Sequence, residues 1–380
     1  MQSTYLSFWE YDSFLKDIDL TVIGSGIVGL TSAYLYKQQH PDKKVVVLES
    51  GVLPHGATTR NAGFACFGSM SEILDDLSEM DEESCFRLVK QRHEGLLDLL
   101  DLHGKSSIGY VHCGGYEVFF QQDQHLFELC LSKLDYVNHT LKKYAGFDTE
   151  VFECIDKPAI WGMNILNKTI FNPFEGQIHS GMLMQHLLKL CHKSGILILN
   201  GVKAKRLEES NHQVFIWAEP FDVRSELVLV CNNGFAAELL PELQVRPARG
   251  QVLVTSPIND LQWEGTFHHY KGYDYFRNVG NRILIGGGRH LDMENEYTSD
   301  METTPIITDY LVSVLKNHVL PEKEFTIEFS WAGIMGKGNS KQPIVKKVSD
   351  RVGVAVRMGG MGVALGTQIA KQAAILISSQ

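Results

Sequence analysis

Three closely spaced glycines near the N-terminus, followed by an acidic residue, form the first group that could do chemistry. Gly24, Gly26 and Gly29 give the pattern G-x-G-x-x-G, directly after the apolar run 20–23 and at the start of a predicted helix. Such a turn lets the backbone approach a pyrophosphate at the helix N-terminus. Glu49 stands 20 residues after Gly29, where a carboxylate binds an adenosine ribose and repels a 2′-phosphate. We therefore predict an adenine dinucleotide site, to which the neighbours Ile27, Val28 and Ser50 also belong.

A second segment, residues 56–63, indicates which dinucleotide binds. It is dense in glycine and hydroxyl groups and carries one cation. Such a segment can follow a pyrophosphate and a ribityl chain to an isoalloxazine ring, whereas an NAD-binding domain needs only an ordinary loop there. The alternative is a solvent-exposed loop. We predict that the segment contributes Thr58, Thr59, Arg60, Asn61, Ala62 and Gly63 to an FAD site.

A glycine cluster in residues 358–366 opens the last predicted helix. Glycine lets a flat ring approach closely, and a helix N-terminus offers amides and a positive dipole that favour the negative charge of a reduced flavin. A helix end packed on its own sheet would give the same pattern. Together with the first two groups the cluster favours a flavin, and its predicted contacts are Gly360, Met361, Gly362 and Val363.

The segment 267–277 is rich in side chains that can bond an amine. Hydride transfer from carbon to a flavin needs a neutral amine, close approach of the two groups and exclusion of water. Alternation along a strand puts Tyr273 and Tyr275 on one face, and we predict that both face the flavin. His269 and, later in the chain, Lys337 are further candidate catalytic residues. The alternative is a surface turn with aromatic side chains packed beneath it.

The elements that must position these groups follow from the hydrophobic pattern. A strand, turn, helix and second strand fit into about thirty residues at 20–48, the size of a βαβ unit. Later segments return to that character, but 251–288 contains several short strands separated by turn residues, which is typical of an antiparallel sheet. The predicted class is α/β, with a Rossmann-type FAD-binding domain interleaved with an α+β substrate domain on an antiparallel sheet. The predicted ranges are 1–90, 175–245 and 330–380 for the first domain, and 91–174 and 246–329 for the second.

Composition limits the class of protein. A chain of 380 residues predicts about two domains. The net charge of −10 argues against a nucleic-acid partner. None of the seven cysteines is spaced as a C-x-x-C pair or as a zinc ligand, which indicates reduced thiols and no metal site. With neither a signal-peptide pattern nor an apolar stretch long enough to span a membrane, we expect a cytoplasmic protein.

These motifs together resemble the D-amino-acid oxidase superfamily, which includes glycine oxidase and sarcosine oxidase. The resemblance also extends to the segments 175–180, 246–253 and 331–333, and residues 275–277, 282–288 and 359–362 look nearest to the gamma-glutamylputrescine oxidase branch. It implies FAD as the cofactor and oxidation of a C–N bond of a small amine or amino acid by hydride transfer to flavin N5. The imine is then hydrolysed, and oxygen or another acceptor takes the electrons. The resemblance adds Val202, whose backbone would face the adenine, Gly234 and Gly333 to the cofactor site.

The chain departs from the family pattern at two positions that concern the substrate and oxygen. Glycine oxidase-like members follow Trp-x-Gly with an arginine that binds the substrate carboxylate, and Met335 stands there in this sequence. Lys337 offers only a point charge, so this departure favours an amine or a modified amino acid over a simple α-amino acid. The strand that would carry a lysine for reaction with oxygen reads Ile283-Leu284-Ile285. No cysteine follows Cys231, so we expect FAD to be bound non-covalently.

Two alternative functions stay open. Members of the superfamily also oxidise C–OH bonds, so the chain could be an FAD-dependent 2-hydroxy-acid dehydrogenase. The missing arginine and lysine are also compatible with a flavoprotein that no longer turns over and serves as an assembly or regulatory factor.

Overall fold

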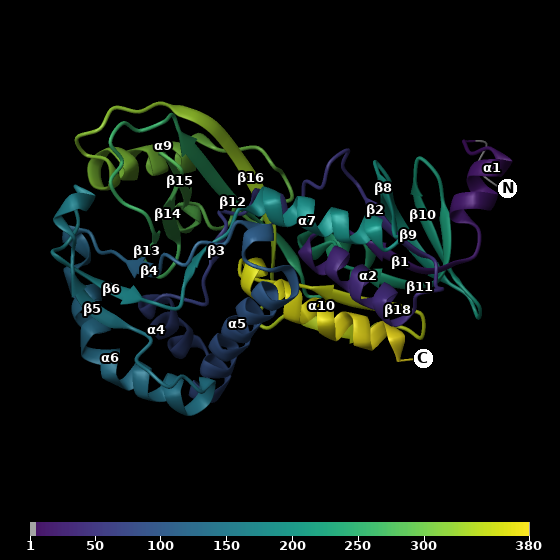
Figure 1. Cartoon of the computed structure of the whole chain (residues 1–380), viewed down its shortest axis with the longest axis horizontal. Helices are drawn as coiled ribbons and strands as arrows, with labels where there is room; N and C mark the ends of the chain where they lie inside the picture. The colour runs from purple at the N-terminus through teal and green to yellow at the C-terminus, as the bar shows by residue number, and fades with distance from the viewer. Residues whose placement is uncertain (1–4, 380) are drawn as a thin grey trace.

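The computed structural model describes residues 5–379, and two large sheets form its framework (Figure 1). The first sheet contains β1 (Ile18–Ile23), β2 (Val45–Glu49), β8 (Leu197–Asn200), β9 (Lys203–Glu209), β10 (Val214–Glu219), β11 (Val223–Val230), β17 (Ile344–Lys347) and β18 (Val352–Val356). Its order is β17-β18-β11-β1-β2-β8, and β10 and β9 extend from β11 as an antiparallel ribbon. The five central strands run parallel, and the aliphatic side chains of β1, β2, β11 and β18 are buried, as is usual in a parallel sheet that is covered on both faces.

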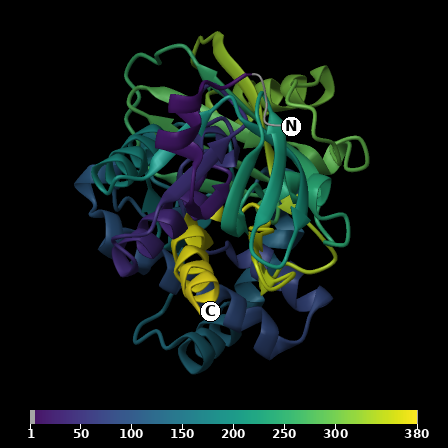
Figure 2. The same ribbon diagram turned by 90° about the vertical axis from the view of Figure 1, so that its right-hand side faces the viewer.

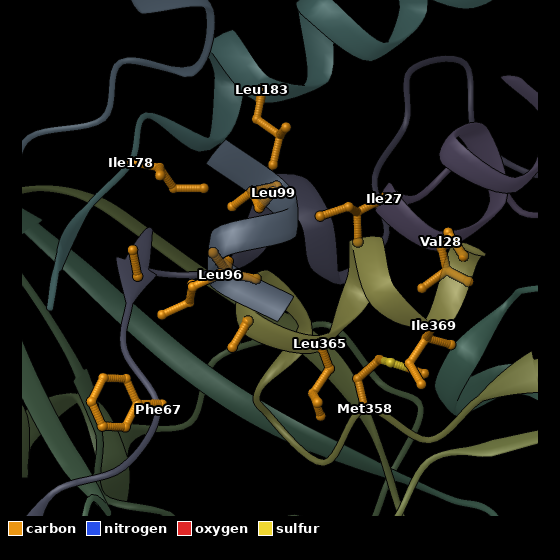
Figure 3. Close-up of a cluster of buried hydrophobic side chains, with 14 of the residues drawn as sticks. Ile27, Val28, Phe67, Leu96, Leu99, Ile178, Leu183, Met358, Leu365 and Ile369 are labelled. Carbon is orange, nitrogen blue, oxygen red and sulfur yellow. The ribbon is translucent and has the colours of Figure 1, made fainter. Parts of the chain in front are cut away.

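Four helices pack together beside this sheet: α2 (Ile27–Gln39), α5 (Glu82–His103), α7 (Ser180–Lys193) and α10 (Gly362–Ser378). Figure 3 shows that Ile27, Leu96, Leu183 and Leu365, one from each helix, meet in one apolar cluster. In Figure 2 the C-terminal helix α10 lies beside the N-terminal elements, in agreement with its extensive contact with α2. A Cβ added at Gly95 of α5 would lie 2.0 Å from the carbonyl oxygen of Ala364, so α5 and α10 approach each other very closely.

The second sheet has the order β16-β12-β15-β14-β13-β4-β6-β5. All its neighbours are antiparallel except β13 and β4, which run parallel. The bounds of its strands are β4 (Gly115–Glu117), β5 (Glu153–Asp156), β6 (Lys168–Asn172), β12 (Arg246–Thr255), β13 (Thr266–His269), β14 (Asp274–Val279), β15 (Arg282–Gly287) and β16 (Ile327–Lys337).

The two faces of the second sheet have different partners. The back face packs on α9 (Pro305–Val314) through Phe267, Phe276 and Leu311. The front face carries Val252 and Leu284, which form a separate cluster with Ala62 from the N-terminal part of the chain. The remaining elements are α1 (Phe8–Glu10), α3 (Ala57–Arg60), α4 (Met70–Glu79), α6 (Gln124–Ala145), α8 (Ala236–Leu239), β3 (Phe64–Ala65) and β7 (Gly176–Gln177).

The predicted fold class is confirmed, and the structure corrects details within it. The predicted domain boundary at residue 330 falls inside β16, which pairs with β12 along its length. The boundary at residue 90 falls inside α5. Both boundaries must therefore move, whereas the division into two domains stays a prediction. No helix among residues 5–379 is both long and apolar enough to cross a membrane.

Candidate functional site

The turn between β1 and α2 has the geometry expected of a dinucleotide site. Gly24 has a φ of +107°, and a Cβ on Gly29 would lie 1.9 Å from the carbonyl oxygen of Gly24, so both positions require glycine. The residue before α2, Gly26, supplies no side-chain cap. The hydroxyl of Thr58 accepts from the amide of Ile27 at 3.0 Å, and the uncapped amides of the first turn, including that of Val28, can donate to a phosphate.

Glu49 ends β2 as a buried carboxylate beside this turn. It accepts hydrogen bonds from the backbone and hydroxyl of Ser25 and from the amide of Gly51. These bonds fix the carboxylate at the end of the strand, where an adenosine ribose would meet it, next to the exposed Ser50. The amide of Val202 donates to the carbonyl of Glu49 at 2.9 Å, so any contact of Val202 with adenine must come from another of its atoms.

The segment 56–63 bridges α2 and the second sheet. Arg60 donates to the carbonyl of Ala332 at 2.8 Å, and the indole of Trp331 donates to the carbonyl of Arg60 at 3.0 Å. The side chains of Thr59 and Asn61 bond backbone carbonyls of residues 54–58. The side chains of Thr59 and Asn61 therefore stabilise the backbone conformation of the segment 56–63.

The C-terminal glycines lie against β16, in the same region. α10 begins after Met361 without a side-chain cap, and Gly360 has a φ of +97°. A Cβ on Gly360 would meet the sulfur of Met335 at 3.4 Å. A Cβ on Gly234 would lie 2.7 Å from the carbonyl oxygen of Met335, and one on Gly333 would lie 2.9 Å from the Cβ of Arg60. Gly362 and Val363 form the first turn of α10.

These residues fit FAD. The helices α2 and α10 both start without a side-chain cap, which leaves two sets of amides for polar groups of a ligand. The segment 56–63 connects the two helix ends, and a Cβ on Gly56 would meet nothing within 4 Å. The α2 end would hold the pyrophosphate, Glu49 the ribose, and the α10 end the flavin.

The front face of the second sheet adjoins the segment 56–63. His268, Tyr275, Gly286, Val252 and Trp331 are successive cross-strand neighbours and therefore share this face. A Cβ on Gly286 would lie 2.5 Å from the Tyr275 ring, so the ring lies over the glycine backbone. Burial raises the pKa of Tyr275 to about 12, which keeps the phenol protonated as a hydrogen-bond donor.

His268 is paired with Glu175 on this face, at 3.0 Å. Burial alone would lower the pKa of His268, but the Glu175 carboxylate outweighs it and the pKa is raised. Cys66 is close enough that its sulfur and the ligand atoms of His268 and Glu175 all lie within 4.8 Å of one another. No sequence spacing predicted this group, because its members come from three distant segments. Glu175 already accepts from the amide of Phe67 and pairs with His268.

Two predicted catalytic residues are not brought to the front face, which corrects the sequence-based arrangement. Tyr273 precedes β14, so strand alternation does not place it beside Tyr275. His269 lies on the back face, where it bonds Asp123 at 2.9 Å and Asp274 at 3.3 Å. These contacts hold a network behind the sheet and leave no ring nitrogen of His269 for a substrate.

Lys337 does lie on the front face, two residues beyond Met335 on β16. Burial, and next the positive charge of Arg289, lower the pKa of Lys337 to about 8. An ammonium that has lost water in this way interacts strongly with an anion. Of the predicted catalytic residues, Tyr275 and Lys337 therefore stand on the face toward the cofactor segment.

The structure brings forward two arginines, of which the sequence analysis counted only Arg277 among the candidate substrate residues of the segment 267–277. Arg277 instead donates to the carbonyls of Ala62 and Ile178, and so holds the end of the segment 56–63 in place. Its position in the tyrosine-rich segment was the only signal for it. Arg289 follows three glycines, and no spacing rule pointed to it.

Comparison with known proteins agrees with this geometry. The chain matches the DAO family, described as FAD dependent oxidoreductase, over residues 19–376. The probable oxidoreductase OrdL of Haemophilus influenzae is 22% identical over 371 residues, which cover 92% of this chain and 80% of that protein.

Solved structures share the fold. Glycine oxidase from Geobacillus kaustophilus superposes with a TM-score of 0.74 at 18% identity, over 95% of each chain. L-proline dehydrogenase from P. horikoshii gives a TM-score of 0.72 at 16% identity, over 96% of this chain and 94% of the other. The predicted family and the predicted FAD cofactor are confirmed, whereas the nearest branch and the non-covalent attachment stay predictions. The chain belongs to the DAO family of FAD-dependent oxidoreductases.

Proposed function

We propose that this enzyme oxidises a C–N bond of a small amine or amino acid. The reaction removes a hydride from the carbon and a proton from the nitrogen, and the resulting imine is hydrolysed in water to a carbonyl compound and ammonia or an amine. FAD, when bound, supplies the acceptor for the hydride at flavin N5. The glycine oxidase and L-proline dehydrogenase that share this fold act, by their names, on substrates of this class.

The observation that carries the proposal is the apolar front face of the second sheet beside the cofactor segment. Val252, Val254 and Leu284 pack with Ala62 there, with Tyr275 partly covering them. Hydride transfer to a flavin needs a substrate carbon held close to the ring and water kept out. A sheet face of this kind provides both conditions without an ionised base.

The polar groups on this face have distinct roles in the proposal. Tyr275 stays a neutral phenol and orients the substrate by a hydrogen bond. Lys337 contributes a positive charge at the end of the face that adjoins Met335. The substrate amine loses its proton to water as it enters, because the buried carboxylates of Glu117 and Glu175 beside His268 already accept hydrogen bonds from other groups.

The test is anaerobic reduction of the FAD-loaded protein by a panel of amines, amino acids and 2-hydroxy acids. We expect flavin absorbance to bleach with at least one amine or amino acid. Bleaching by hydroxy acids alone would replace the proposal with a 2-hydroxy-acid dehydrogenase. Bleaching by none of the three classes would favour a flavoprotein without turnover.

A further inference from the structure

Arg289 is a buried arginine for which residues 5–379 provide no ion pair. Its side chain belongs to a residue only 8% exposed, and its Nε and Nη2 atoms have no hydrogen-bond partner among residues 5–379. A buried guanidinium is costly unless its donors are paired. Such an orphaned group points to a partner that binds from outside the chain.

The backbone holds Arg289 firmly in this position. Gly287, which ends β15, and Gly288, which follows it, have φ values of +129° and +73° and turn the chain sharply. The carboxylate of Asp274 accepts from the amide of Gly288 at 2.8 Å. The guanidinium carbon then lies 4.5 Å from the centre of the Tyr297 ring, which orients its plane. The side chain of Arg289 is therefore held in its buried position before any ligand binds.

Most of the charged groups that act on Lys337 are positive. The charged groups that act on Lys337 are Arg289, Lys341, Arg92 and the carboxylate of Glu72. Arg92 pairs with Glu72 at 3.2 Å, and Lys341 pairs with a buried carboxylate, that of Asp76. Of these four cations, Arg92 and Lys341 form ion pairs, whereas Arg289 and Lys337 form none with the residues that the structure describes.

We propose that Arg289 and Lys337 together bind the carboxylate of the substrate, an inference that rests on the proposed function. Met335 occupies the β16 position where the glycine oxidase-like pattern has an arginine, and its sulfur faces Gly360 at the start of α10. The guanidinium of Arg289 supplies a planar fork for two carboxylate oxygens, and the ammonium of Lys337 adds a point charge. The substrate is accordingly an amino acid rather than a simple amine.

The test is a titration of the FAD-loaded protein with benzoate, followed by flavin absorbance and by the melting temperature, with benzamide as the uncharged analogue. We expect benzoate to bind and benzamide not to bind. The Arg289→Met variant should weaken benzoate at least about 30-fold, because truncating one partner of a desolvated charge pair costs about 2 kcal/mol or more. Lys337→Met should weaken it less.

Arg246→Met is the matched control. Arg246 stacks on the same Tyr297 ring, at 3.9 Å, but is exposed to solvent. The Arg246→Met variant should leave the affinity for benzoate unchanged. Equal benzoate affinity in wild type and Arg289→Met, or equal losses in Arg289→Met and Arg246→Met, would overturn the subsite. Absence of benzoate binding to the wild type would overturn it as well.

This outcome is independent of the proposed reaction. Binding of benzoate that depends on Arg289, in a protein whose flavin no amine or amino acid reduces, would support the subsite and contradict the function. Reduction of the flavin by simple amines, with no dependence on Arg289, would support the proposed function and contradict the subsite.

Discussion

Two buried arginines near the second sheet differ in whether their donors are paired. On the back face Arg249 forms a paired site: its guanidinium donates to Glu296 at 2.7 Å and to the carbonyl of Glu302 at 2.9 Å. Beyond the end of the neighbouring strand β15, Arg289 is equally buried, but two of its nitrogens find no hydrogen-bond partner in the part of the chain that the structure describes. Both residues are about nine-tenths buried, so exposure does not distinguish them. Their partners do.

The difference separates a structural charge from a functional one. A buried ion pair with its hydrogen bonds complete is costly to break, because removing one partner leaves the other uncompensated. A buried charge with no partner already carries that cost in the folded state, and a ligand is what removes it. Arg249 should therefore matter for folding and Arg289 for binding.

The largest effect should come from breaking the paired arginine. Arg249→Met leaves the buried Glu296 carboxylate with only Gln251 as a side-chain partner, and we expect the free energy of unfolding to fall by about 3–5 kcal/mol. Urea denaturation of the FAD-loaded protein measures it. If Arg249→Met lowers the free energy of unfolding by less than Arg246→Met does, the pair of Arg249 and Glu296 does not stabilise the fold.

The unpaired arginine should behave in the opposite way. Arg289→Met removes an uncompensated buried charge, so we expect the ligand-free protein to unfold at an equal or higher urea concentration, with a gain of up to about 2 kcal/mol. The same denaturation experiment, without added carboxylates, measures it. A loss comparable to that of Arg249→Met would show that Arg289 has an internal structural role.

A third buried arginine sharpens the comparison, because its partners are neutral. Arg277 donates to the carbonyl of Ala62 and to the side chain of Gln177, and desolvation lowers the pKa of Arg277 to about 10. Arg277→Met should loosen the segment 56–63 and weaken FAD binding by about tenfold, the equivalent of about 1.4 kcal/mol. Titration of the apoprotein with FAD measures this, and Arg246→Met serves as the control. Unchanged FAD affinity would show that the segment holds its shape without Arg277.

The smallest effect should appear as a pH dependence. Burial, with Arg289, Lys341 and Arg92 acting against Glu72, lowers the pKa of Lys337 to about 8. Lys337 is therefore charged below that pH and neutral above it, and benzoate is ionised throughout. Affinity for benzoate should fall by less than about tenfold as the pH rises through 8, since one point charge contributes about 1 kcal/mol.

Lys337→Met should bind benzoate with the same affinity on both sides of that pH. A wild-type affinity that does not change with pH, or a variant that keeps the dependence, would remove Lys337 from the subsite. The depressed pKa also makes the folded protein bind fewer protons than the unfolded chain above about pH 8. Stability should therefore rise with pH there through this group.

The sequence predicted the parts of the site that depend on local pattern. The turn at Gly24 and Gly29, the carboxylate of Glu49 and the glycines before α10 follow from spacing, because each lies at the end of a strand or the start of a helix. The fold class followed from the same strands. Tyr275 packs beside Ala62 of the segment 56–63, on the face that strand alternation gives it, whereas its contact with the flavin stays a prediction.

The parts that depend on long-range pairing could not be predicted. The face of His269 is set by the register of β13 against β14, and Tyr273 falls one residue before β14 begins. Cys66, Glu175 and His268 meet only because three distant segments converge. The lack of a partner for Arg289 is a property of the packed chain, and no residue spacing carries it.

The most direct test of the account is anaerobic reduction of the flavin by an amino acid and by the amine that the same molecule becomes without its carboxylate. We expect the amino acid to bleach the wild-type flavin at much lower concentration than the amine. In the Arg289→Met variant, the concentration of amino acid needed to bleach the flavin should rise at least about 30-fold, whereas the concentration of amine needed should not change. Equal reduction by both molecules in the wild type, or an advantage that survives in Arg289→Met, would contradict the account.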